Sequence, residues 1–65
     1  MRIIVNANPH DVAEAVLSDA LRELGFVSPA FAIALNGRFV PREHHAKTSL
    51  NDGDQLEVLA PMQGG

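Results

Sequence analysis

The sequence predicts an α+β fold in which a single helix packs across one face of a small mixed sheet. Three observations favour this fold: a β-branched segment near the N-terminus, an Asn-Gly turn between two short apolar segments, and a segment of alternating polarity near the C-terminus. Between the first segment and the turn, apolar residues recur at helical intervals. A helix on one side of a sheet buries the apolar faces of both elements.

The N-terminal segment Arg2–Val5 is short and β-branched, and residues 6–9 after it have a turn composition, so we expect a strand that ends in a turn. The following region has two interpretations. Asp11 and Glu14 have the spacing of a capping box, and apolar residues continue at helical spacing to residue 24, which favours one long helix from residue 11. The alternative places a short second strand at residues 10–13, paired with the first strand, and begins the helix near residue 17. Periodicity alone favours the single helix.

Gly25 suits the left-handed position that follows a helix, and Pro29 prevents the helix from resuming. Residues 31–35 then form a predicted strand. Because side chains alternate along a strand, the larger ones at 31, 33 and 35 are expected to face the helix, while Ala32 and Ala34 face away. Asn36-Gly37 is typical of a type I′ turn, so residues 38–40 are expected to return as the second strand of a hairpin.

The C-terminal half of the chain supplies the last strand. Leu50 is expected to anchor a polar, irregular segment in the core, and residues 51–54 have a turn composition. Residues 55–60 then alternate, with Leu56 and Val58 on one face and Leu59 on the other. Placed parallel to the first strand, this strand becomes central in the sheet, as in a β-grasp. We expect a β-grasp domain over residues 1–60 and a flexible C-terminal tail over residues 61–65.

Size and composition restrict the function. A chain of 65 residues has little room for an ordinary ligand pocket, so an enzyme with its own active site is not expected. The net charge of −3 disfavours nucleic acid or an anionic membrane as a partner. The sequence has no cysteine, signal peptide or membrane-spanning stretch, which favours a cytoplasmic location.

We expect no metal site. His44 and His45 are adjacent, so their side chains diverge, and nothing completes a tetrahedral set. These histidines and His10 are interpreted as surface residues. Asp52 and Asp54 lack the ligand loop of an EF-hand and are interpreted as turn residues.

The sequence ends in Gly64-Gly65, a pair that composition alone would place there in about six of a thousand chains. Residues without side chains can pass through a narrow channel. The pair could therefore present the carboxylate of Gly65 to another enzyme, although small residues also collect at disordered chain ends.

Four motifs together resemble the ThiS family of sulfur carriers in thiazole biosynthesis, and the resemblance covers essentially the whole chain. The motifs are Ala34-Leu35-Asn36-Gly37, Val40-Pro41-Arg42-Glu43, Asp52-Gly53-Asp54-Gln55-Leu56-Glu57-Val58 and Gly64-Gly65. The resemblance implies a ubiquitin-like β-grasp, and with it the short second strand. The sequence departs from the family at His45, where members often have Trp.

The resemblance also implies that this chain is a substrate rather than an enzyme. By this resemblance, a ThiF-like adenylating enzyme, using ATP and Mg²⁺ that this chain does not bind, is expected to convert Gly65 to an acyl-adenylate. A sulfur donor system then produces a thiocarboxylate, which donates its sulfur to a ThiG-like thiazole synthase. Met62, Gln63 and Gly64 are the candidate residues that enter the partner's channel, and Met is adaptable at binding surfaces.

A small apolar patch is expected on the sheet face away from the helix, formed by Ala32, Ala34 and Leu59. Such patches often bind partners, although scattered apolar surface residues are also common. The chain alone is expected to be a monomer. Two other functions stay open: the small sulfur-carrier subunit of molybdopterin synthase, and a ubiquitin-like protein modifier.

Overall fold

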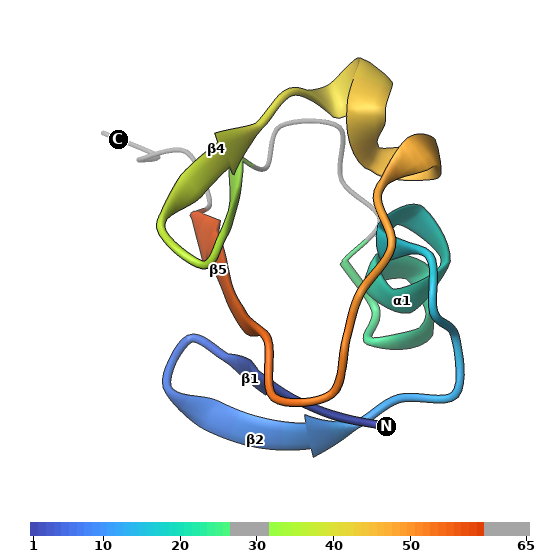
Figure 1. Ribbon diagram of the computed structural model, residues 1–65, viewed down its shortest axis with the longest axis vertical. Coiled ribbons are helices and arrows are strands. Elements are labelled where there is room, and N and C mark those ends of the chain that lie inside the picture. Colours follow the sequence, from blue (N-terminus) through green and yellow to red (C-terminus); the bar gives the residue numbers. More distant parts are fainter. Residues whose placement is uncertain (27–31, 60–65) are drawn as a thin grey trace.

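The computed structural model describes residues 1–26 and 32–59 and shows a five-stranded sheet that curves around one α-helix (Figure 1). The elements follow the predicted order, with an additional short strand after the first one. They are β1 (Arg2–Val5), β2 (Asn8–Asp11), α1 (Leu17–Glu23), β3 (Ala32–Leu35), β4 (Arg38–Val40), the 3₁₀ helix η1 (Arg42–Lys47) and β5 (Gln55–Leu59).

The sheet has the strand order β2-β1-β5-β3-β4. β5 runs parallel to β1 and antiparallel to β3, while the β1–β2 and β3–β4 pairs are antiparallel hairpins. The last strand is therefore central, and the prediction of a mixed sheet with a parallel pair of terminal strands is confirmed. The first and last strands of the chain lie side by side because of this pairing.

A single apolar core fills the space between the sheet and α1. β5 alternates between the core, where it places Leu56 and Val58, and solvent. Leu50 is buried as predicted, and it reaches the core from the segment between η1 and β5. Among the described residues, the buried side chains of the core are all aliphatic: Ile3, Val5, Val12, Leu17, Ala20, Leu21, Ile33, Leu50, Leu56 and Val58.

The prediction of one long helix from residue 11 is wrong, and the interpretation with a second strand is confirmed with shifted bounds. β2 begins at Asn8 because Asn6 and Ala7, both with positive φ, form a two-residue turn that pairs Val5 with Asn8. Pro9 is tolerated because β2 is an edge strand. The interpretation with a second strand places that strand at residues 10–13, two residues later than β2.

Residues 12–16 do not join the helix because other segments take their backbone hydrogen bonds. The Val12 N–H donates to the Met1 carbonyl at 2.9 Å, and the Ala15 carbonyl accepts from Leu50 N–H at 2.7 Å.

The carboxylate of Glu23 accepts the N–H groups of Ala13 and Glu14 at 3.0 and 3.1 Å. The expected capping box between Asp11 and Glu14 is therefore not formed, and Asp11 pairs with Arg2 instead.

The helix ends where the sequence predicts. Gly25 has φ +92°, and its N–H donates to the Arg22 carbonyl, while Phe26 N–H donates to the Leu21 carbonyl. These two bonds form a Schellman motif, which needs a residue that adopts the left-handed conformation without strain. The motif also places Phe26 against the core.

Four sequence-based predictions concern segments outside the described residues. They are the start of the strand at Phe31, the end of the last strand at Ala60, the flexible tail over 61–65 and the boundary between domain and tail. Within residues 1–26 and 32–59, no helix is long and apolar enough to cross a membrane.

Candidate functional site

The candidate site is the sheet face that points away from α1, which we call the outer face. On β5, Gln55, Glu57 and Leu59 are exposed on this side. On β3, Ala32 and Ala34 are half-buried and alternate with the buried Ile33. The alternation that hides one side of each strand in the core therefore leaves the other side open.

Strand pairing brings the three residues predicted as a patch together. Ala32 is opposite Leu59, and Ala34 is opposite Glu57, in the β3–β5 pair. Residues opposite each other in a ladder share a face and have Cβ atoms about 4.5–5.5 Å apart. The side chain of Leu59 is 59% exposed, so most of its apolar surface is available to a partner.

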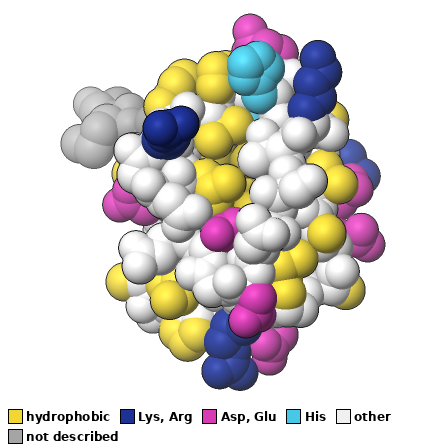
Figure 2. All heavy atoms as spheres, in the orientation of Figure 1, with side chains coloured by type: hydrophobic (Ala, Val, Ile, Leu, Met, Phe, Trp, Pro, Cys, Tyr) yellow, Lys and Arg dark blue, Asp and Glu magenta, His cyan; other side chains and the backbone are white. Residues whose placement is uncertain are grey.

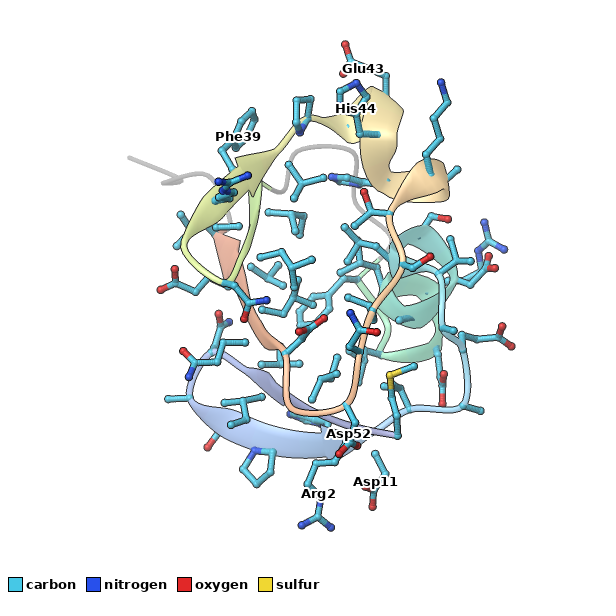
Figure 3. All side chains as sticks on the ribbon, viewed as in Figure 1. Arg2, Asp11, Phe39, Glu43, His44 and Asp52 are labelled. Carbon is cyan, nitrogen blue, oxygen red and sulfur yellow. The ribbon has the colours of Figure 1, made fainter. Side chains whose placement is uncertain are left out.

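The sequence analysis missed Phe39, which belongs to the same face. Phe39 is opposite Ala34 in the β3–β4 pair and is 68% exposed, and Figure 3 shows its ring pointing outward from β4. The turn contained the signal that would have found it. A two-residue Asn36-Gly37 loop pairs Leu35 with Arg38, so the next pair is Ala34 with Phe39.

The outer-face patch is therefore a row of apolar side chains across three adjacent strands, with one carboxylate within it. We define it as Ala32, Ala34, Phe39, Glu57 and Leu59. Among the described residues, no cation forms an ion pair with Glu57. The patch thus offers exposed apolar surface and a free negative charge to a binding partner.

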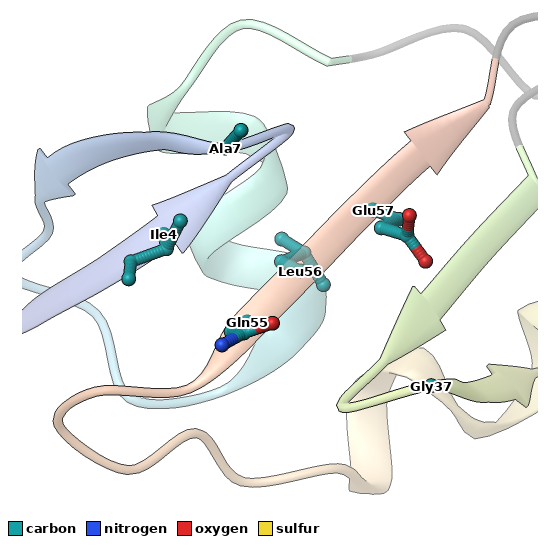
Figure 4. A pocket seen from close by; sticks show the side chains of 6 residues that line it. All are labelled: Ile4, Ala7, Gly37, Gln55, Leu56 and Glu57. Atoms are coloured by element: carbon teal, nitrogen blue, oxygen red, sulfur yellow. The ribbon is translucent and has the colours of Figure 1, made fainter.

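A depression of about 170 Å³ lies beside the patch, lined by Ile4, Ala7, Gly37, Gln55, Leu56 and Glu57 (Figure 4). Ligand pockets usually have about 300–1,000 Å³. The depression is too small for such a ligand and contains one titratable side chain. It therefore does not provide an active site.

Four charged side chains outside the patch make structural contacts. Arg2 Nε donates to Asp11 Oδ1 at 3.2 Å, and this hydrogen bond raises the pKa of the Arg2 guanidinium above its ordinary value. Asp52 accepts the Arg2 backbone N–H at 2.7 Å, and the three residues lie together at the end of the β1–β2 hairpin (Figure 3). Asp54 Oδ2 accepts Asn51 N–H at 2.7 Å, which closes the predicted turn.

His44 and His45 lie next to each other in η1. In the described part of the chain, no three His, Cys, Asp or Glu side chains are grouped closely enough to hold a metal ion. His44 points outward from η1 as expected for a surface residue (Figure 3). The surface interpretation of His45 is wrong, because its ring is half-buried and Nε2 is 3.0 Å from the Val40 carbonyl oxygen. His45 thus connects η1 to β4.

The face seen in Figure 2 has acidic and basic side chains interspersed around its edge, with no concentration of Lys and Arg. Met62, Gln63, Gly64 and Gly65, the predicted tail residues, lie outside the described residues. The structure therefore places the expected patch but not the expected reactive end.

A model of the ThiS family matches residues 3–65, which is almost the whole chain and includes Gly64-Gly65. The chain belongs to the ThiS family. The resemblance based on its motifs is thereby confirmed.

Solved structures agree with this membership. The crystal structure of thiamine biosynthesis protein ThiS from Geobacter metallireducens matches over the full length of both chains, with 32% identity and a TM-score of 0.82. A solution structure of a thiamine biosynthesis protein from the same organism also matches, with 34% identity and a TM-score of 0.78. This match includes all of the present chain and 88% of the chain in the solution structure. The β-grasp fold expected of a ThiS family member is confirmed.

A curated relative extends the comparison to a longer protein. Thiazole synthase of Paramagnetospirillum magneticum is 33% identical over 66 residues, which cover all of this chain but 20% of that protein. This ThiS family chain therefore spans about one fifth of the length of that relative.

Proposed function

We propose that this chain is a sulfur carrier of thiamine biosynthesis and serves other enzymes as a substrate. The observation that carries the proposal is the ThiS family match, which runs through the terminal Gly64-Gly65. Similarity to thiamine biosynthesis proteins over the entire chain supports the pathway. The similarity to part of a thiazole synthase supports such an enzyme as the sulfur acceptor.

The reaction takes place on Gly65 and requires a free carboxylate there. A carboxylate oxygen attacks the α-phosphorus of ATP, pyrophosphate leaves, and an acyl-adenylate forms. Sulfide then attacks the carbonyl carbon and AMP leaves, which produces a thiocarboxylate without net oxidation. The ThiF-like partner supplies ATP, Mg²⁺ and the electrostatic stabilisation of both steps, and the ThiG-like synthase receives the sulfur.

The carrier contributes reach and a docking surface. Five extended residues from Pro61 span about 17 Å, enough to bring Gly65 into a buried site while the β-grasp domain stays outside. Met62, Gln63 and Gly64 would enter the partner's channel ahead of the domain, and glycine allows the channel walls to approach the backbone most closely.

The outer-face patch is the surface that we assign to docking on the adenylating enzyme. Phe39 and Leu59 are the exposed anchors, and the small side chains of Ala32 and Ala34 leave a flat area between them. Aromatic anchors in desolvated contacts contribute disproportionately to binding. Because Glu57 lies within the patch, the matching surface should be apolar with an Arg or Lys opposite this carboxylate.

Intact mass spectrometry tests the proposal. The chain is incubated with the adenylating enzyme of the thiamine pathway, Mg-ATP and sulfide, and the expected result is exchange of one carboxylate oxygen for sulfur. Absence of this exchange would refute the carrier function. Covalent conjugates with other proteins in a cell extract would favour the modifier, and sulfur transfer only to a molybdopterin precursor would favour the molybdopterin synthase subunit.

Deletion of Gly65 tests the reactive residue. The shortened chain should unfold at the same urea concentration as the full chain, because the buried residues of the described core all lie between residues 3 and 58. Thiocarboxylate formation should be lost, since the new terminus is one residue, about 3.5 Å, short of the reacting position. Unchanged sulfur incorporation by the shortened chain would show that Gly65 is not the acceptor.

A further inference from the structure

The central strand β5 extends beyond the end of β1, its neighbour on one side. β1 ends at Val5, which pairs with Leu56, whereas β5 continues to Leu59. The N–H and C=O groups of Val58 point toward the side of β1, where the backbone has already turned away into the β1–β2 hairpin. A buried strand end without backbone partners would be costly.

The side chain of Asn6 takes the place of the missing strand residue. Its Oδ1 accepts the Val58 N–H at 2.9 Å, and its Nδ2 donates to the Val58 carbonyl at 3.2 Å. The Asn6 backbone N–H donates to the Leu56 carbonyl at 2.9 Å, which continues the ladder by one more bond. A side-chain amide carries the same donor and acceptor as a peptide group, so it can replace one.

The backbone of Asn6 explains why an amide residue is suited to this position. Its φ of 49° is in the left-handed region, which Asn tolerates better than most residues. Gly would allow the turn but lose both bonds to Val58. Asp would keep the acceptor for the Val58 N–H and lose the donor to its carbonyl.

We propose that Asn6 is a positioning residue for the carrier tail: by holding both backbone groups of Val58, it sets where β5 ends and the direction from which the chain continues to Gly65. On its other side this strand end is held by the pairing of Leu59 with Ala32. The inference rests on the proposed function, because it assigns Asn6 a role in presenting the reactive carboxylate.

Asn36 is a natural control because it makes the same kind of contact at the opposite end of β5. Its φ is 51°, its Oδ1 accepts Gln55 N–H at 2.9 Å, and its Nδ2 donates to Asp54 Oδ1 at 3.1 Å. Loss of the Asn36 amide therefore removes a comparable pair of bonds, but from the beginning of the strand. Only Asn6 lies at the end that leads to the tail.

The experiment compares Asn6→Gly with Asn36→Gly in the full 65-residue chain, since glycine preserves the turn at both positions. Pyrophosphate release by the thiamine-pathway adenylating enzyme is measured against carrier concentration. Asn6→Gly should lower kcat about tenfold and leave KM within about twofold, because docking is intact and the carboxylate is misplaced. Asn36→Gly should leave kcat and KM within about twofold of the wild type.

Amide hydrogen exchange tests the contact without any enzyme. Asn6→Gly should accelerate exchange of the Val58 amide about tenfold or more relative to the wild type, whereas Asn36→Gly should accelerate Gln55 and not Val58. If the wild-type chain is never adenylated, the proposed function fails. Separately, Val58 exchange in Asn6→Gly that equals the wild-type rate would overturn the role of Asn6.

Asn6→Asp is the second variant in case Asn6→Gly does not fold, which circular dichroism would show. It should keep slow exchange at Val58 and still reduce kcat, because a carboxylate oxygen now faces the Val58 carbonyl. Equal kcat losses for the Asn6 and Asn36 variants would reduce Asn6 to a structural residue and overturn the proposal. So would wild-type kcat in both Asn6 variants.

Discussion

At the scale of single residues, polar side chains supply the backbone hydrogen bonds that strands and helix leave unmade. Glu23, the last residue of α1, accepts backbone N–H groups from residues 13 and 14 with both carboxylate oxygens. Thr48 Oγ1 donates to the His44 carbonyl at 2.7 Å and closes the end of η1. These contacts join the segment between β2 and α1 to the end of the helix, and residue 48 to η1.

Replacement of Glu23 by alanine should destabilise the fold by about 1 kcal/mol, since two N–H groups lose their acceptor. Glu14→Ala is the matched control. In a long helix beginning at residue 11, the Glu14 carboxylate would cap the N-terminus, but here its side chain makes no described contact, so its removal should cost less than about 0.5 kcal/mol.

Urea unfolding followed by circular dichroism distinguishes the two variants. A larger loss of unfolding free energy for Glu14→Ala than for Glu23→Ala would favour the long helix from residue 11 and contradict the structure. Both variants should also retain wild-type affinity for a docking partner, because neither side chain belongs to the outer-face patch.

At the scale of elements, the sequence predicts those parts whose local signal and tertiary environment agree. Asn36-Gly37 has the residues that a type I′ turn requires, and Gly25 has the conformation that ends the helix, so the hairpin and the helix end are where they were expected. Alternation along β5 likewise predicts which side faces the core, because each strand has one buried face.

The region between β1 and α1 was mispredicted by periodicity because local and tertiary preferences conflict there. Apolar residues such as Val12 have helical spacing, yet Val12 is buried through an extended segment bonded to Met1. Only the family resemblance favoured the short strand, and the interpretation that includes this strand places it at residues 10–13, two residues later than β2. The role of Phe39 escaped notice for another reason: its register was calculable from the turn, but its exposure depends on β4 being an edge strand.

The outer-face patch, which spans three strands, supports a prediction about docking. Phe39→Glu should weaken binding to the proposed adenylating partner by about 2 kcal/mol, roughly thirtyfold in Kd, because it removes an exposed aromatic side chain and adds a carboxylate to a patch that already contains Glu57. Stability should change by less than about 1 kcal/mol, since the side chain is mostly in solvent.

Ala46→Glu is the control, because it adds the same charge at an exposed position of η1 outside the patch. Calorimetric titration of both variants with the partner provides the comparison. Equal affinity of Phe39→Glu and wild type would place docking on another surface, and equal weakening by both variants would indicate a general charge effect.

At the scale of the whole molecule, stability depends on a sheet that joins the two ends of the chain. β1 and β5 pair residues 4 and 5 with residues 55 and 56, so the central ladder forms only when nearly the full sequence is present. Ten buried residues make up the described core. A domain of this length is expected to have about 3–10 kcal/mol of stability, so a single core truncation removes a large share of it.

The two faces of β5 allow this dependence to be tested within one strand. Leu56 is 1% exposed and Leu59 is 59% exposed, although both are leucines three residues apart. Leu56→Ala should cost about 2–5 kcal/mol, through lost burial and the cavity left in the core, whereas Leu59→Ala should cost less than about 0.5 kcal/mol. In urea, Leu56→Ala should therefore unfold at a far lower concentration, while Leu59→Ala keeps the wild-type midpoint and loses only affinity for the partner. Similar midpoints for the two variants would mean that the chain does not bury the face of β5 that packs on α1, and the orientation of the outer-face patch would then be wrong as well.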